Sequence, residues 1–144
     1  MKNKLHFKTF HFLSFVSLQK IQKLKFTFTK QEKLTHKQQI ANLFKHGKAL
    51  KSFPIRALFL ENELSYHRVL ISVPKRRHKT AVARNRLKRL MREAYRKNKH
   101  QIKNNSTHFD LVLIYVAPQE LSYKVVDTSI IKIIDKLANS KSPQ

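Results

Sequence analysis

The feature that most constrains this chain is a strongly basic segment, residues 75–99, which lies between two apolar, strand-like runs. The segment contains 12 Lys or Arg residues and a single acid, Glu93. Apolar residues recur along one side at helical spacing, whereas Lys88, Arg92 and Arg96 place like charges four residues apart on the other. Each such pair costs an isolated helix roughly 0.2–0.5 kcal/mol, and an anionic ligand removes that cost. We therefore predict a helix that packs on a core by one face and binds nucleic acid by the other.

The charge of the whole chain indicates the same kind of partner. The 144 residues include 31 Lys or Arg and 8 Asp or Glu, which gives a formal net charge of +23. Such a surplus repels itself in a compact protein unless a polyanion neutralises it. Hydrophobic residues make up 41% of the chain, too many for a basic tail that never folds. The length suits one domain with a core of its own.

Several classes of site are excluded by composition. The chain has no cysteine, so disulfides, thiolate nucleophiles and Cys-ligated metals are ruled out. Its single glycine, Gly47, leaves no glycine-rich phosphate loop for a nucleotide cofactor. The apolar runs are shorter than the roughly 20 residues that span a bilayer. The eight His show no metal-binding spacing and the eight acids are mostly single, so we predict no catalytic or metal site on the protein.

The first half of the predicted domain contains a helix and two strands. Thr35 and Gln38 fit a capping box for a short helix over 35–46, and Gly47 supplies its C-terminal stop. Two strand-like runs follow, residues 54–60 and 66–73, separated by a polar turn, and we predict that they form a hairpin. A further short strand is possible around Leu50.

The second half is predicted to contain helix, strand and helix. Thr80 caps the basic helix, which runs to about Lys99. A third strand occupies 109–116, and Ser122 opens a last helix with an apolar stripe formed by Val126, Ile130, Ile133, Ile134 and Leu137. The pattern indicates an α+β sandwich in which helices pack on a small sheet.

Residues 1–25 differ from the rest of the chain, with phenylalanines placed among Lys, His and Ser. We predict a poorly ordered basic extension, followed by an RNA-binding domain over 26–140 and a tail at 141–144. The alternatives for the extension are an amphipathic helix on RNA or lipid, an upstream stretch from a misassigned start, or a secretory signal. The signal is the weaker alternative, because His11 and Ser14 break the apolar run and a small-x-small cleavage site is missing.

The basic segment also carries a family resemblance. The run Ser72-Val73-Pro74-Lys75-Arg76-Arg77, followed by Arg84-Asn85-Arg86-Leu87-Lys88-Arg89, resembles the signature of the bacterial ribonuclease P protein component. The core of that signature is an Arg-Asn-Arg triplet, a hydrophobic residue and Lys-Arg. The resemblance covers roughly residues 26–138.

The resemblance implies a fold and a function. The fold is α+β, of the ribosomal S5 domain 2-like type, with a βαβ unit of left-handed crossover. The function is that of the protein subunit of ribonuclease P, an endoribonuclease whose RNA subunit removes 5′ leaders from precursor tRNA with Mg²⁺. The implied partners are the catalytic RNA and precursor tRNA, the implied location is the cytoplasm, and no stable membrane association is expected.

Site residues also follow from the resemblance. The positions implied to bind RNA are Lys75, Arg76, Arg84, Asn85, Arg86, Lys88, Arg89 and Arg92. Ile40 and Phe44 stand at first-helix positions that line a cleft for the single-stranded leader. Ile40 departs from the family, where an aromatic is frequent, as do Leu70 in place of Gly and Lys79-Thr80 in place of Gly-Asn.

Alternatives remain open at this stage. Asn85 either contacts RNA or braces the loop, and Phe44 either stacks on a base or belongs to the core with Phe59, Tyr66 and Tyr115. A ribosomal or RNA-chaperone-type protein shares the basic face but does not prefer precursor to mature tRNA. A protein-only ribonuclease cleaves without RNA, and a membrane-surface peptide depends on residues 1–25 alone.

Overall fold

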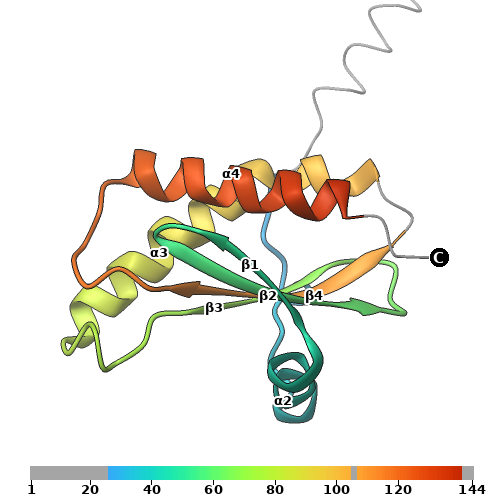
Figure 1. Cartoon of the computed structure of the whole chain (residues 1–144), viewed down its shortest axis with the longest axis horizontal. Helices are drawn as coiled ribbons and strands as arrows, with labels where there is room; N and C mark the ends of the chain where they lie inside the picture. Colours follow the sequence, from blue (N-terminus) through green and yellow to red (C-terminus); the bar gives the residue numbers. More distant parts are fainter. Residues whose placement is uncertain (1–25, 105–106, 141–144) are drawn as a thin grey trace, which may run out of the picture.

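The computed structural model describes residues 26–104 and 107–140, so the predicted extension at 1–25 and the tail at 141–144 lie outside the described residues. The elements in chain order are α2 (Lys37–His46), β1 (Lys48–Ser52), β2 (Ile55–Asn62), β3 (Arg68–Ser72), α3 (Ala81–Asn98), the short 3-10 helix η1 (Lys99–Asn104), β4 (His108–Tyr115) and α4 (Tyr123–Asn139). Figure 1 shows α4 and α2 on opposite sides of the sheet. This arrangement confirms the predicted α+β class.

The sheet corrects the predicted hairpin. The strand order is β1-β2-β4-β3, so β4 separates the two strands that were expected to pair. The hairpin that does form joins β1 to β2, which confirms the short strand around Leu50. β2 pairs antiparallel with β4, and β3 pairs parallel with β4. The chain from β3 through α3 to β4 is therefore a βαβ unit.

The central place of β4 has a physical reason. Six of its eight residues are buried, in the pattern of a strand covered on both faces. β3 has five residues, of which Val69 alone is buried, and it forms an edge of the sheet. The apolar run of β4 thus gains most from lying between β2 and β3.

The helices α3 and α4 cover one face of the sheet. Leu87, Met91 and Tyr95 of α3 are buried against alternate residues of β2 and β4. The stripe predicted on α4 is confirmed, because all five of its residues are buried in the same core. The predicted cap of α3 is also confirmed, since the Thr80 hydroxyl accepts a hydrogen bond from the Ala83 amide at 3.3 Å.

The other face of the sheet carries α2. Leu43 of α2 packs with Leu34, Leu58 and Val112 in a second, smaller cluster. The capping box at Thr35 was wrong: His36 is the N-cap residue and forms no side-chain cap. The preceding residue Leu34 is hydrogen-bonded to β3, and this keeps the chain extended before the helix.

Gly47 ends α2 as predicted, but without a left-handed conformation. Its φ is −67°, and its amide donates to the Leu43 carbonyl oxygen. A β-carbon at this position would lie 2.3 Å from that oxygen. Close backbone approach, rather than backbone flexibility, is what requires glycine here.

Candidate nucleic-acid interface

The basic face of α3 is set by the packing of its other side. Leu87, Met91, Ala94 and Tyr95 are almost completely inaccessible to solvent, which fixes the rotation of the helix on the core. The opposite side therefore faces outward. Asn85, Arg86, Arg89 and Arg92 are exposed there, and Lys88 is half-buried beside them.

The loop between β3 and α3 extends this face. Lys75 and Arg76 are exposed in a turn that is closed by hydrogen bonds from the amides of Arg77 and His78 to the Pro74 carbonyl, both at 3.2 Å. The His78 ring is buried, with Nε2 3.0 Å from the Ala117 carbonyl oxygen. The two loop cations are thus presented from an anchored turn.

Arg84 also has a structural role, which the sequence motif does not indicate. Its Nη1 donates to the carbonyl oxygens of His78 at 2.9 Å and Lys79 at 2.6 Å. These bonds tie the start of α3 to the preceding loop. Arg84 thus positions the turn that carries Lys75 and Arg76, and its contact with RNA stays a prediction.

Asn85 is exposed, and its side chain forms no hydrogen bond with the residues that the structure describes. The loop is braced by Arg84 instead. Of the two alternatives for Asn85, an outward contact is the one that this geometry favours.

Acids neutralise only part of α3. Glu93 binds Arg96 through two contacts, at 2.6 and 2.9 Å, and lies 3.6 Å from Lys97. The hydrogen bond from Arg96 lowers the pKa of the Glu93 carboxyl. Arg86 lies 3.7 Å from Glu120, a loose pair at an exposed position. Within the described residues no ion pair engages Lys88, Arg89 or Arg92.

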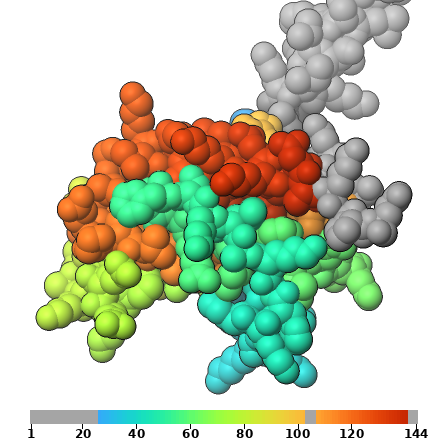
Figure 2. Space-filling view, viewed as in Figure 1, coloured from blue at the N-terminus to red at the C-terminus, as the bar shows by residue number. Residues whose placement is uncertain are grey.

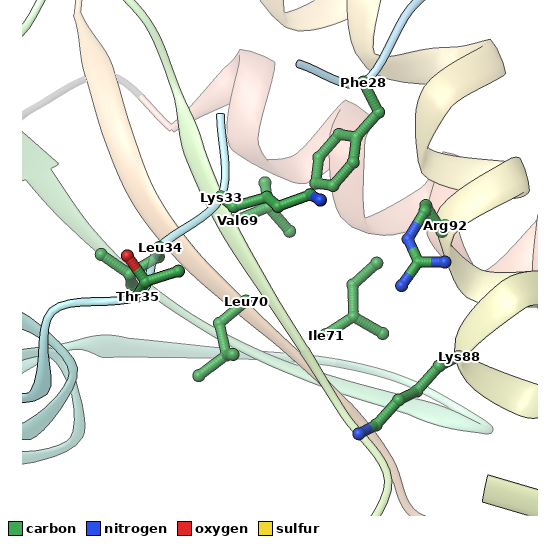
Figure 3. A pocket seen from close by; sticks show the side chains of 9 residues that line it. All are labelled: Phe28, Lys33, Leu34, Thr35, Val69, Leu70, Ile71, Lys88 and Arg92. Carbon is green, nitrogen blue, oxygen red and sulfur yellow. The ribbon is translucent and has the colours of Figure 1, made fainter. Parts of the chain in front are cut away.

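A hollow of about 220 Å³ lies between α3 and the edge strand β3. Figure 3 shows Lys88 and Arg92 of α3 pointing toward β3, with Lys33 and Phe28 directed into the same space from the N-terminal segment. Three cations and one aromatic ring therefore line one hollow at the sheet edge. This combination suits a nucleotide, whose phosphate binds cations and whose base stacks on a ring.

Lys33 and Phe28 were missed by the sequence analysis. They are placed by a short pairing of the N-terminal segment with β3. The Leu34 amide donates to the Val69 carbonyl at 3.1 Å, and the Val69 amide donates to the backbone carbonyl of Glu32 at 2.7 Å. Such an isolated bridge leaves no periodic pattern in the sequence. The signals available in the sequence were the alternation of Phe and Thr over residues 26–29 and the two lysines that follow it.

The C-terminal end of α3 holds that segment. Lys99 forms an ion pair with Glu32, and the Thr29 amide donates to the same carboxylate at 2.7 Å. Arg96 and Lys99 also donate to the carbonyl oxygens of Phe26 and Thr27. Partial burial acts to raise the pKa of Glu32, but the hydrogen bonds from Lys99 and Thr29, together with the charge of Lys99, outweigh it and the pKa is lowered.

The proposed leader residues lie on α2. Phe44 is 51% exposed and therefore does not belong to the core, whereas Phe59 and Tyr115 are buried. Ile40, one helical turn away, is half-buried on the second cluster beside Leu60, Leu70 and Ile114, which are also only partly buried. An exposed ring thus stands next to an incompletely covered apolar sheet face.

A polar network fixes α2 on the sheet. Arg68 of β3 binds Asp110 of β4 through Nε at 2.8 Å and Nη2 at 2.6 Å, and its Nη1 donates to Gln39 of α2 at 2.6 Å. Asn62 donates to the same aspartate at 2.8 Å. The sequence signal for this network was an aspartate inside the apolar strand β4. Because Gln39 directly precedes Ile40 in α2, this network fixes the position of Ile40 and Phe44 relative to the sheet.

His67 packs inside the fold. His67 is stacked on Phe109, whose amide donates to His67 Nδ1 at 3.1 Å. Burial, aided by the charge of His108, lowers the pKa of His67 to about 4.

In residues 26–104 and 107–140, no three His, Asp or Glu side chains come together in a way that could hold a metal ion. No helix in these same ranges is long and apolar enough to cross a membrane.

Comparison with known proteins identifies the family. The sequence model described as Ribonuclease P matches residues 28–138. The ribonuclease P protein component of Porphyromonas gingivalis W83 is 31% identical over 122 residues, which cover 80% of this chain and 89% of that protein. The Thermotoga maritima component is 40% identical over 88 residues, covering 61% and 72%.

Solved structures agree with this result. The ribonuclease P protein of Thermotoga maritima superposes with a TM-score of 0.63 at 28% identity, covering 73% of this chain and 96% of that one. The Staphylococcus aureus protein, at 22% identity and the same TM-score, shows the shared fold. The family match spans most of the chain and includes the α3 face, the hollow beside it and α2. The chain therefore belongs to the ribonuclease P protein family.

Proposed function

We propose that this chain supports 5′ maturation of tRNA by holding the catalytic RNA on the basic face of α3 and the single-stranded leader of precursor tRNA on α2. The observation that carries the proposal is a group of cations on α3, Lys88, Arg89 and Arg92, that no acid of the described residues pairs with. Guanidinium groups bind phosphate through paired donors and stack on bases, which suits a folded RNA. Family membership supports the assignment.

The protein's own part in the reaction is binding and positioning. Glu32, Glu93 and Asp110 each form an ion pair with a nearby cation, so these carboxylates stabilise the fold. We assign the Mg²⁺ ions and the hydrolytic step to the RNA subunit. The protein increases the local concentration of substrate by contacting both RNA molecules, and the cytoplasm is the compartment that this function implies.

Reconstitution tests the proposal. The purified chain alone should leave precursor tRNA intact, and the cognate catalytic RNA with Mg²⁺ should mature its 5′ end at low salt faster with the chain than without it. Cleavage at the mature 5′ end by RNA-free protein, after rigorous removal of contaminating nucleases, would contradict the proposal. Equal affinity for precursor and mature tRNA would instead indicate a general RNA-binding protein.

The leader contact is tested at Phe44. Replacing Phe44 by Ala should weaken precursor binding relative to mature tRNA by roughly 1–3 kcal/mol, the value of a lost base stack. Because the ring is half-exposed, thermal stability should change little, unlike the loss of about 3–5 kcal/mol for a buried phenylalanine. Ile40→Phe, which adds a second ring on the same face, should strengthen precursor binding. Unchanged precursor preference in both variants would remove α2 from the leader site.

A further inference from the structure

A second surface, at the sheet edge opposite the hollow beside α3, has no role in the function proposed above. Phe53 lies in the turn between β1 and β2 and is 67% exposed. The turn consists of Phe53 and Pro54, joined by a cis peptide bond, and it leaves the Phe53 ring exposed to solvent. Val125 of α4 is also exposed nearby, and the two residues line a hollow of about 300 Å³. Figure 2 shows the turn from β1 to β2 lying against the first part of α4.

The hollow is flanked by positive charge. Lys124 and Lys132 of α4 line it, and no acid does. Of the two acids in α4, Asp127 is hydrogen-bonded to Asn98 at 2.9 Å on the side facing α3, and Asp135 lies beyond Lys132 outside the hollow. The two lysines are eight residues apart, which is roughly 12 Å along a helix. They can therefore bind two phosphates of a strand that follows the helix axis.

The hollow is built before any ligand arrives. The Ser129 hydroxyl donates to the Ser52 carbonyl, and Lys136 Nζ donates to the Lys51 carbonyl at 3.0 Å. Both bonds hold the end of β1 against α4. A preformed site avoids part of the ordering cost of binding.

The sheet order places this hollow away from the basic face of α3. β1 and β3 are the two opposite edges of the sheet, and the hollow lined by Lys88 and Arg92 lies at β3. A ligand at Phe53 therefore does not compete for the contacts of α3. The two surfaces can engage separate segments of RNA.

We propose that the hollow between the β1–β2 turn and α4 is a second RNA-binding site, which holds a single-stranded segment with one base against Phe53 and its phosphates on Lys124 and Lys132. The proposal rests on the function proposed above only in taking RNA as the polyanion. One ring and one valine offer far less than the roughly 800 Å² that each partner buries in a stable protein interface. A single base, by contrast, needs only one ring on which to stack.

The chain contains no tryptophan, so Phe53→Trp creates a unique fluorophore at the site. The experiment uses the full chain with Lys88, Arg89, Arg92 and Phe44 replaced by Ala, which weakens both the α3 face and the leader surface proposed on α2. A single-stranded 12-nucleotide oligouridine should quench the fluorescence of the introduced tryptophan. In the same background, Lys124→Gln with Lys132→Gln should flatten the log-log salt dependence of binding by about 1.4, from a slope of about 0.7 for each phosphate contact. Without the tryptophan, Phe53→Ala should weaken binding roughly tenfold.

Lys48→Gln is the matched control, because this exposed lysine lies at the other end of β1. Lys48→Gln should leave quenching and affinity as they were. The proposal is overturned if oligouridine binds without changing the fluorescence of the introduced tryptophan, or if the two lysine changes have the same effect as the control. A fluorescence response to anionic phospholipid vesicles, or to protein concentration, in place of RNA also overturns it. Because this assay uses neither catalytic RNA nor tRNA, its result is separate from the reconstitution test.

Discussion

The cations of α3 up to Arg92 and those from Arg96 onward are used differently. In the first group, Lys88, Arg89 and Arg92 have no acid within ion-pair distance among the described residues. In the second group, Arg96 binds Glu93, and Lys99, which directly follows the helix, binds Glu32 and the N-terminal segment. The difference teaches that residue type alone does not assign a basic residue to RNA. The acids and carbonyl groups within reach decide whether a cation serves the fold or a ligand.

The largest expected effect comes from removing the unpaired cations. Lys88, Arg89 and Arg92 replaced together by Ala should flatten the log-log salt dependence of binding to the catalytic RNA by about 2–3, at a slope of about 0.7–0.9 for each phosphate contact. Circular dichroism and melting temperature should remain close to those of the parent, because the buried side of α3 is unchanged. A salt slope equal to that of the parent would show that Lys88, Arg89 and Arg92 do not contact the RNA.

For Lys99, which holds the N-terminal segment, we predict a loss of stability instead. Lys99 is 11% exposed at its side chain and Glu32 21%, so Lys99→Ala leaves a largely buried carboxylate without its cation, held by Thr29 alone. We expect a loss of about 1–3 kcal/mol in the free energy of unfolding by urea. The salt slope of RNA binding should stay that of the parent. A stable variant with a flattened slope would place Lys99 among the RNA contacts.

Arg84 should show an intermediate behaviour. Arg84→Ala removes two hydrogen bonds to loop carbonyls, and a loss of about 1–2 kcal/mol in unfolding free energy is expected, since each bond contributes about 1 kcal/mol or less at a partly exposed position. Arg89→Ala is the matched control, because Arg89 is exposed and should leave stability unchanged. Equal stability of the two variants would mean that Arg84 does not brace the loop.

The smallest effect is a dependence on acid pH. Folding lowers the pKa of Glu32 below its ordinary value of 4.5. Its contribution to stability is therefore complete above pH 4.5 and is lost as the pH falls through the lowered folded-state pKa. The difference in stability between the parent chain and Lys99→Ala should shrink in that window. If the difference in unfolding free energy between the two proteins stayed constant from about pH 6 to the acid pH at which the parent unfolds, the Glu32–Lys99 pair would not be its source.

Local patterns in the sequence predicted most of the elements. The helix from Thr80, the stripe on α4 and the outward face of α3 follow from periodicity and capping, which depend on neighbours in sequence. The pairing of the strands does not. The polar turn after Glu61 suggested a hairpin, but the apolar run of β4 takes the central position because both of its faces are covered.

The site was predictable to a similar degree. The motif led to Lys75, Arg76, Arg86, Lys88, Arg89 and Arg92, all of which the structure places on the α3 face, its loop or the hollow. It gave no warning that Arg84 is tied to the loop carbonyls. Phe28 and Lys33 join the hollow through a tertiary pairing of Leu34 with Val69, which periodicity does not record.

Lysine footprinting by acetylation and mass spectrometry, with and without the catalytic RNA, tests the central claim most directly. Lys75 and Lys88 should react in the free protein and become protected in the complex. Lys99, held by Glu32 and the Thr27 carbonyl, should react slowly in both states. Lys88 that remains fully reactive in a saturated complex, or Lys99 that reacts freely until RNA protects it, would contradict the account.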